Sequence, residues 1–206
     1  MAVLAKGEGE ILDWSPLPDT VTDEPSFETG VITKSTEIEV DLLITVAHMD
    51  ANDALSNYVT VSVMKKLGEN TEDWKLHYSQ QAGGGQALTE ALDAESASGQ
   101  KQIKVAATGD FDTGLGERLL LYNVGDLALS EVVMIDGWAD ADYYIANENL
   151  ANTHDAGDGD ALYNGVNEIT VRLPKSVETT KVTFHNSDDD ANYLVRVDYS
   201  EVTGIA

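Results

Sequence analysis

The stretch Glu37-Ile38-Glu39-Val40-Asp41-Leu42 alternates acidic and apolar side chains through six consecutive positions. Successive side chains of a β-strand point to opposite faces of the sheet, so this alternation predicts a strand with one buried face and one face in water. Residues 58–64 repeat the alternation with polar side chains between three valines. Together the two stretches indicate half-buried strands of an antiparallel sheet.

Further segments of strand-like composition follow, and turn residues separate them at short intervals. The expected strands are residues 43–47, 74–78, 102–105, 118–122, 127–135, 138–145, 168–173, 179–185 and 193–199. Asp136-Gly137 and Gly125-Asp126 predict tight hairpins, because Asp and Gly adopt positive φ readily. Helix-like spacing of apolar residues occurs only within residues 86–98, where we expect one short helix or an ordered loop.

Many short strands, frequent turns and little helix predict an all-β protein. We expect an antiparallel β-sandwich, either jelly-roll-like or immunoglobulin-like, with at most one short helix. A chain of 206 residues can bury one large core or two small ones. We favour one sandwich domain over residues 29–206 with 83–116 as an excursion, and a subdivision near the glycine-rich segment 108–116 is the alternative.

The first 28 residues differ from the body, since they hold three of the four prolines. Proline cannot donate to a sheet ladder and favours an extended residue before it, so residues 1–28 are expected to form an extended N-terminal arm. The apolar side chains of this arm need a surface to cover, either on the parent domain or on a neighbouring subunit, and we favour the neighbour. The expected interface residues are Ile11, Leu12, Trp14, Leu17, Val21 and Phe27.

The chain carries 37 acidic residues against 12 basic ones, a formal net charge of -25. Such a surface repels nucleic acid and anionic membranes, and it attracts cations and basic protein surfaces. Adaptation to high salt and plain solubility are alternative reasons for the acidity. Every apolar run is too short to span a bilayer or to form a secretory signal, so we expect cytoplasmic synthesis and neither a membrane nor a nucleic-acid partner.

The strongest signal for a ligand is the segment 154–165, in which aspartates alternate with glycines. Ca²⁺ takes about six to eight oxygen ligands from flexible loops, so Asp155, Asp158 and Asp160 are the candidate metal ligands and Ca²⁺ is the candidate cofactor. The segment resembles the nonapeptide of calcium-binding β-helix repeats, but it occurs once and is one residue short before Asp160. A solvated surface turn without a cofactor is the alternative interpretation.

Signatures of catalysis are missing from the sequence, which has no nucleophile elbow, dinucleotide-binding loop, phosphate loop or zinc-protease motif. The absence of cysteine excludes thiol catalysis, thiolate metal sites and disulfides. Tryptophans on an exposed sandwich face would suit sugar stacking, whereas buried tryptophans would belong to the core. We therefore expect a protein that is not an enzyme.

The apolar arm, Ile11 to Phe27, and the β-rich body after Thr29 resemble in overall style the auxiliary proteins of tailed-phage virions. These are capsid decoration or cement proteins and related β-sandwich components of heads and tails, and the resemblance includes no diagnostic motif. It implies a homo-oligomeric virion structural protein, made in the host cytoplasm and placed on the virion surface. Its arm and sheet surfaces would dock on major capsid or other virion subunits. The alternatives are a calcium-dependent carbohydrate-binding or adhesion module and a polysaccharide-acting hydrolase.

Overall fold

The computed structural model describes residues 2–4, 8–17, 27–34, 39–49, 58–66, 73–83, 88–106, 111, 116–140, 142–177, 179–187 and 192–201. In these residues the regular structure is almost entirely β, with two 3-10 helices of three residues each. The all-β antiparallel sandwich predicted from the sequence is confirmed. None of the helices in the described ranges has the length and hydropathy that crossing a bilayer requires.

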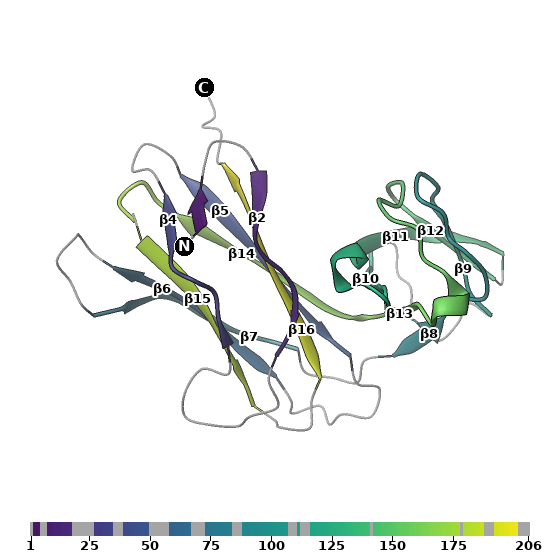
Figure 1. The fold of residues 1–206 in the computed structure, drawn as a ribbon, viewed down its shortest axis with the longest axis horizontal. Coiled ribbons are helices and arrows are strands. Elements are labelled where there is room, and N and C mark those ends of the chain that lie inside the picture. The colour runs from purple at the N-terminus through teal and green to yellow at the C-terminus, as the bar shows by residue number, and fades with distance from the viewer. Residues whose placement is uncertain are drawn as a thin grey trace. The chain divides into compact units, whose positions relative to one another are not determined.

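The chain forms two compact units that it visits alternately (Figure 1). Unit 1 comprises Met1–Val46, Ser56–Gly84 and Asn167–Ala206, and unit 2 comprises Ala47–Leu55 and Gly85–Val166. The excursion expected at 83–116 thus extends to residue 166, because the strands that follow it pack around a second core. The segment 108–116, considered above as a boundary, falls inside unit 2.

Unit 1 is a sandwich of two sheets. One sheet contains Ala2–Leu4 (β1), Phe27–Glu28 (β3), Ile32–Lys34 (β4), Val59–Lys66 (β6), Lys75–Ala82 (β7) and Thr179–Asn186 (β15). The other contains Glu8–Pro16 (β2), Val40–His48 (β5), Gly165–Leu173 (β14) and Tyr193–Glu201 (β16). Their orders are β1-β4-β15-β6-β7, with β3 also on β15, and β14-β5-β16-β2. β1 and β4 pair in parallel, unlike the other pairs of the six-stranded sheet.

The two sheets of unit 1 enclose one apolar core. In β6 the side chains of Val59, Val61 and Val63 are fully buried and alternate with partly exposed ones, as the sequence predicts. β5 contributes Ile44 and Val46 to the same core from the opposite sheet. Each such side chain contributes about 1.5–3 kcal/mol on burial, so the alternation in sequence becomes the force that holds the sheets together.

The N-terminal segment belongs to this sandwich. β2 pairs antiparallel with β16, and the backbone N–H of Leu17 donates to the carbonyl of Tyr193 at 2.9 Å. Trp14 and Leu17 are only 5% and 4% exposed, so their assignment to a subunit interface is corrected: both cover the parent domain. Pro16 is tolerated there because β2 is an edge strand.

The other expected interface residues are less deeply placed. Ile11, Leu12 and Phe27 are partly buried and pack against the core of unit 1 as well. Val21 lies outside the described residues. The apolar residues of the arm that the structure describes therefore find their surface within this chain, since strand pairing with β16 and β15 brings them onto its core.

Unit 2 contains one six-stranded sheet of order β8-β13-β10-β11-β12-β9. Its elements are Thr89–Ala91 (β8), Gln102–Lys104 (β9), Arg118–Tyr122 (β10), Leu127–Leu129 (η1), Glu131–Asp140 (β11), Tyr143–Ala146 (β12), Ala156–Asp158 (η2) and Ala161–Tyr163 (β13). Its core contains Leu119, Leu121, Ile135, Tyr144 and Leu162, all almost completely buried. The sheet and this core position the loops that carry the site described next.

Two turn predictions in unit 2 are wrong. Gly125-Asp126 lies in the connection of residues 123–130, which contains η1, so it does not form a tight hairpin turn between β10 and β11. Asp136-Gly137 lies inside β11, where the register with β12 shifts between Ile135 and Gly137, so the dipeptide forms a bulge and not a hairpin turn. Of the two alternatives expected for residues 86–98, a short helix or an ordered loop, the described part shows no helix. Pairing of β8 with β13, and of Leu92 with Val105, satisfies this backbone as sheet and overrides the helical spacing of its apolar residues.

Candidate polar site in unit 2

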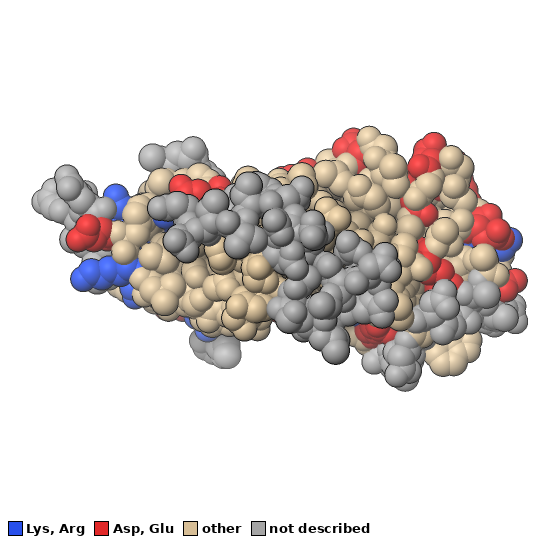
Figure 2. Space-filling model, turned by 90° about the horizontal axis from the view of Figure 1, so that it is seen from below, with Lys and Arg blue, Asp and Glu red and all other residues tan. Residues whose placement is uncertain are grey.

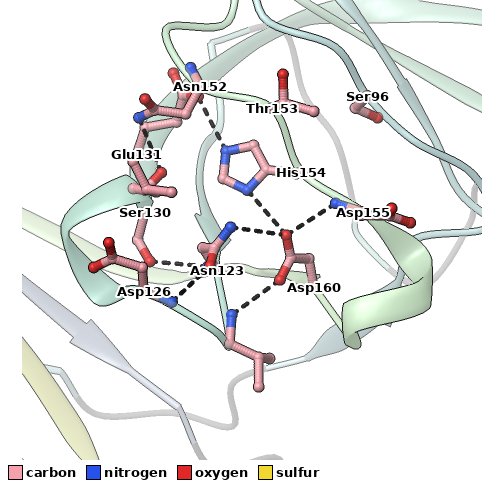
Figure 3. A network of polar contacts seen from close by, with 12 residues as sticks. Ser96, Asn123, Asp126, Ser130, Glu131, Asn152, Thr153, His154, Asp155 and Asp160 are labelled. Atoms are coloured by element: carbon pink, nitrogen blue, oxygen red, sulfur yellow. Dashed lines mark hydrogen bonds and ion pairs between the residues drawn. The ribbon is translucent and has the colours of Figure 1, made fainter.

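The aspartate-rich segment 154–160 forms part of a buried polar network (Figure 3). It begins with a short turn, in which Asp155 caps η2 by accepting a hydrogen bond from the N–H of Gly157 at 2.8 Å. Gly159 ends the turn with φ of 88°, a left-handed conformation that glycine adopts without strain. This tight turn brings the side chain of Asp160 back beneath the backbone of Asp155.

Asp160 is the centre of the network and is 1% exposed. Its Oδ1 accepts from the backbone N–H of Val124 at 2.9 Å. Its Oδ2 accepts from Nδ2 of Asn123 at 3.1 Å and from the N–H of Asp155 at 3.0 Å. Three donors compensate the desolvation of this carboxylate, and they attach the loop after β10 to the loop before β13.

His154 is fully buried between two carboxylates. Its Nε2 lies 3.1 Å from Oε1 of Glu131, whereas its Nδ1 lies 3.5 Å from Oδ2 of Asp160. The shorter contact is a hydrogen bond, and the longer one is an electrostatic contact. The backbone of His154 also exchanges two hydrogen bonds with Ser96, at 2.8 and 3.0 Å, so the ring is fixed by main chain as well as by side chains.

Glu131 stands at the first position of β11 and caps the loop that leads to His154. Its carboxylate accepts from the N–H groups of Ala151 and Asn152 at 2.9 and 3.0 Å. Burial tends to raise the pKa of Glu131, but the hydrogen bonds from His154, Ala151 and Asn152 outweigh burial and hold that pKa below its ordinary value. Glu131 is therefore a carboxylate at neutral pH.

The loop between β10 and β11 is ordered by its own polar contacts. The N–H of Asn123 donates to Oγ of Ser130 at 2.9 Å, and Oδ1 of Asn123 accepts from the N–H of Asp126 at 2.8 Å. Asp126 in turn caps η1 by accepting from the N–H of Ala128 at 3.1 Å. Asn123 is thus the link between this loop and Asp160.

The three aspartates predicted to bind a metal do not converge on one point. Asp155 and Asp158 are exposed, while the oxygens of Asp160 face N–H donors, whose partial positive charge disfavours a cation. Across the described ranges, no group of three or more His, Asp or Glu side chains is arranged to hold a metal ion. Asp160 is instead a buried hydrogen-bond acceptor that connects three segments of backbone.

This arrangement stabilises loops and is poorly placed for chemistry on an outside molecule. A histidine between two carboxylates has the composition of an acid–base site, but His154 and Asp160 have almost no contact with solvent. A general acid or base must come within hydrogen-bond reach of its substrate. The network therefore stabilises the loops of unit 2. Because its members depend on one another, the loss of stability on removing one of them is larger than a single hydrogen bond would give.

Sequence reasoning identified His154 and Asp160 by composition but missed Glu131 and Asn123. Glu131 precedes His154 by 23 residues and Asn123 precedes Asp160 by 37. No local spacing relates residues so far apart, because strand pairing in the sheet brings them together. The dipeptide Gly125-Asp126 was visible in the sequence as a turn signal, and it is the only signal close to Asn123.

Unit 1 has a surface depression of about 550 Å³ lined by β2, β5 and β16. Arg196 lies in it and pairs with both oxygens of Asp198 at 2.9 and 3.2 Å and with Glu10 at 3.4 Å. Burial and then the neighbouring Asp13 raise the pKa of Glu10, with Asp198 adding to the rise and Arg196 opposing it. The guanidinium is thus engaged by carboxylates of the depression itself.

The three tryptophans differ in exposure and surroundings. The ring of Trp74 is partly buried and has the Nζ atoms of Lys66 and Lys181 at 5.0 and 5.1 Å from its centre, within the range of cation–π contacts. Trp138 in β11 is 60% exposed. Trp14 is buried, so of the three tryptophans only Trp138 offers most of its surface to a ligand.

Fold and site define a two-unit β-protein with a sandwich, a second six-stranded sheet and a buried polar network that fixes the loops of that sheet. No family model and no curated protein matches the chain. Among solved structures the chain is similar to the structure of infectious bursal disease virus Gx strain, at 11% identity over 98% of this chain and 77% of that chain, with a TM-score of 0.18. A TM-score this low does not establish a shared fold.

Proposed function

We propose that this protein is a virion structural protein of the decoration or cement kind, which works by occupying a place in an assembly. The observation that supports the proposal best is the use of the segment 154–160. This segment has the composition of a ligand-binding site. Its buried side chains, His154 and Asp160, instead connect loops of unit 2 to one another. What remains for function is the surface that these rigid loops present.

The loop between β10 and β11 is the docking element that we infer. Val124 is 51% exposed and Leu129 is 39% exposed, although the backbone of this loop is bonded to Asp160 and Ser130. An ordered loop loses little conformational entropy when a partner covers it, so its apolar side chains add more to affinity than those of a mobile loop. Because Trp14 and Leu17 are buried, this loop replaces the arm as the proposed contact.

The acidic surface would add long-range attraction to a basic shell. A net charge of -25 accelerates encounter with a positively charged surface. This attraction weakens as salt is added, because salt screens charges beyond about 8 Å at physiological ionic strength. Many copies on a repetitive shell would combine modest single contacts into firm attachment. We therefore expect binding to a particle that depends on salt and on the apolar loop.

Two measurements test this role. The first is mass spectrometry of particles purified from cells that express the chain from its natural locus, where we expect it as a stoichiometric component. The second is co-sedimentation of added protein with those particles, in which Val124→Ser with Leu129→Ser should lower affinity at least about tenfold, since each exposed apolar contact is worth roughly 1 kcal/mol. Ala91→Ser with Ala151→Ser, at two exposed positions of unit 2 and without a change of charge, is the control. Absence from particles, together with no co-sedimentation, would exclude the proposal.

A carbohydrate-binding module is the second candidate, because Trp138 is 60% exposed. An exposed indole stacks on the apolar face of a sugar ring. Glycan-array binding that is lost in Trp138→Ala, while particle binding stays absent, would favour this function over the first. We expect such binding to persist in a calcium chelator, since Asp155, Asp158 and Asp160 do not form a common site.

A further inference from the structure

The six-stranded sheet of unit 1 ends at β7. This strand pairs with β6 from Lys75 to Ala82, with a register shift at His77, and no described strand continues the sheet on its other side. In antiparallel sheets every second residue of an edge strand directs its N–H and C=O outward. β7 therefore offers a row of backbone groups that another strand can pair with.

β7 is also the least protected of the long edges. Proteins commonly protect an exposed edge with charges, proline or short length. β1, β8 and β9 have three residues each, and β2 carries three acidic residues and Pro16. β14 has a charged residue of each sign, and one of its carbonyls, that of Arg172, lies 3.0 Å from Nε2 of His77. β7 has eight residues, no proline and one residue that is always ionised at neutral pH, Lys75; beyond the bulge at His77, residues 78–82 form a regular edge without any charged residue.

The stretches of sequence that form β6 and β7 are poor in carboxylates. About one residue in six of this chain is acidic, 37 of 206. Yet the runs 54–68 and 74–89, which contain β6 and β7, have no Asp or Glu, and acidic residues occur between them only at Glu69, Glu72 and Asp73. In Figure 2 the blue basic side chains gather mainly at the end of the view where β6 lies in Figure 1. Two copies can approach through this edge with the least repulsion between carboxylates.

We propose that β7 pairs antiparallel with β7 of a second copy about a two-fold axis, so that the two six-stranded sheets become continuous. Centred on Gln80, this pairing sets Gln80 opposite Gln80 of the other copy, Ser79 opposite Gln81 and Tyr78 opposite Ala82. Each Lys75 is five residues from the axis, so at about 3.4 Å per residue the two Lys75 residues stand about 34 Å apart. Salt screens charges beyond about 8 Å under physiological conditions, so the lysines do not oppose the contact.

The side chains of β7 suit such a partner. Ser79 comes opposite the amide of Gln81, and the ring of Tyr78 comes opposite Ala82. The edge is thus self-complementary, with apolar, hydroxyl and amide groups in place of like charges. Dimerisation through β7 would give the proposed structural role a defined assembly contact. The biological purpose of the dimer rests on the proposed function, whereas the inference that the dimer forms rests only on the edge strand.

Sedimentation velocity of the purified full chain tests the contact over a range of protein and salt concentrations. We expect a monomer–dimer equilibrium that strengthens with salt, because salt screens the repulsion between two chains of net charge -25 and leaves backbone hydrogen bonds intact. A contact between the lysines and the acidic surface of another copy would instead weaken with salt, and this result would overturn the inference.

Matched charge variants locate the contact. Gln80→Glu with Gln81→Glu adds two carboxylates to β7, and we expect at least tenfold weaker dimerisation at low salt. Gln100→Glu with Gln102→Glu adds the same charge to unit 2 and should change dimerisation much less. Thermal melts verify that both variants fold, which is expected because these glutamines are exposed or partly exposed.

The cysteine-free chain allows one label per copy. A spin label on Ser79→Cys should show strong dipolar broadening in the dimer, whereas a label on Gln102→Cys should not. A protein that stays monomeric, or one that dimerises equally well as the β7 glutamate variant, contradicts the pairing. Monomeric protein that still co-sediments with particles would contradict this inference alone and leave the proposed function in place.

Discussion

Nδ1 of His154 lies 3.5 Å from Oδ2 of Asp160, and both side chains are buried. The same oxygen accepts hydrogen bonds from Asn123 and Asp155, and the opposite ring nitrogen of His154 faces Glu131. One chain of contacts therefore joins the loop after β10, the turn at η2 and the start of β11. Such a network stabilises when it is complete and is costly when one member is removed.

The first prediction concerns Asp160. In Asp160→Asn an amide group replaces one of the acceptor oxygens and meets N–H donors, so we expect a loss of about 2–4 kcal/mol in the free energy of unfolding of unit 2. Asp158→Asn, at an exposed position, should change it by less than about 0.5 kcal/mol. Urea unfolding followed by circular dichroism measures both. If Asp158→Asn lowers stability in calcium-containing buffer only, the loop binds an ion, and this result would contradict our conclusion that the turn at residues 155–160 is not a metal site.

The second prediction concerns pH. The pKa of Glu131 is lower in the folded chain than its ordinary value of 4.5, so its contribution is complete above that pH and is lost as pH falls through the folded-state pKa. Wild-type protein should therefore be more stable than Glu131→Gln at neutral pH, and this difference should shrink steadily below about pH 4.5. Unfolding free energies of both proteins between pH 7 and pH 3 test the effect. A difference that is constant over this range would show that the charge of Glu131 is not involved.

The fold class was accessible to sequence reasoning where the pattern is local. In residues 58–64 the alternation assigns both the strand and its buried face, since Val59, Val61 and Val63 point into the core. Sequence reasoning failed where strand pairing, and not the local sequence, decides between a turn and a continuing strand. Asp136-Gly137 has the composition of a hairpin turn, but pairing with β12 continues past it and turns it into a bulge.

The candidate site was only half accessible for the same reason. The turn around Gly159 can be read from the sequence, yet the role of Asp160 depends on donors more than 30 residues earlier in the chain, at Asn123 and Val124. The arm shows the same limit. Its apolar composition predicted correctly that Trp14 needs a surface, but composition does not distinguish the chain's own core from that of a neighbour.

The third prediction concerns a contact across β2 and β16. Gly9 pairs with Tyr199, and a Cβ at position 9 would lie 2.6 Å from Cε1 of that ring. Gly9→Ala must displace the ring, so we expect a loss of about 1 kcal/mol. In Tyr199→Leu the same change should cost much less, because the ring that it meets is gone. Thermal unfolding of the four proteins gives the coupling energy, and additive effects would contradict the close approach.

The fourth prediction concerns the N-terminal segment. If residues 1–28 were an arm that does not pack on unit 1, their deletion would leave a folded body. In this structure the deletion removes β2, and it removes the side chains of Trp14 and Leu17 from the core of unit 1. We expect the truncated chain to aggregate, because β16 then becomes an exposed, largely apolar edge strand.

A milder variant tests the same point without removing a strand. Trp14→Ala should lower the free energy of unfolding by about 3–5 kcal/mol, as expected for a buried tryptophan. Trp74→Ala, at a partly exposed ring in contact with two lysines, should cost clearly less. Denaturant unfolding compares the two proteins. Two results together would show that the segment lies outside the core: a truncated chain that is soluble and unfolds cooperatively, and a Trp14→Ala variant with an unchanged free energy of unfolding. A strand that contributes to the core cannot be removed without lowering the stability of what remains.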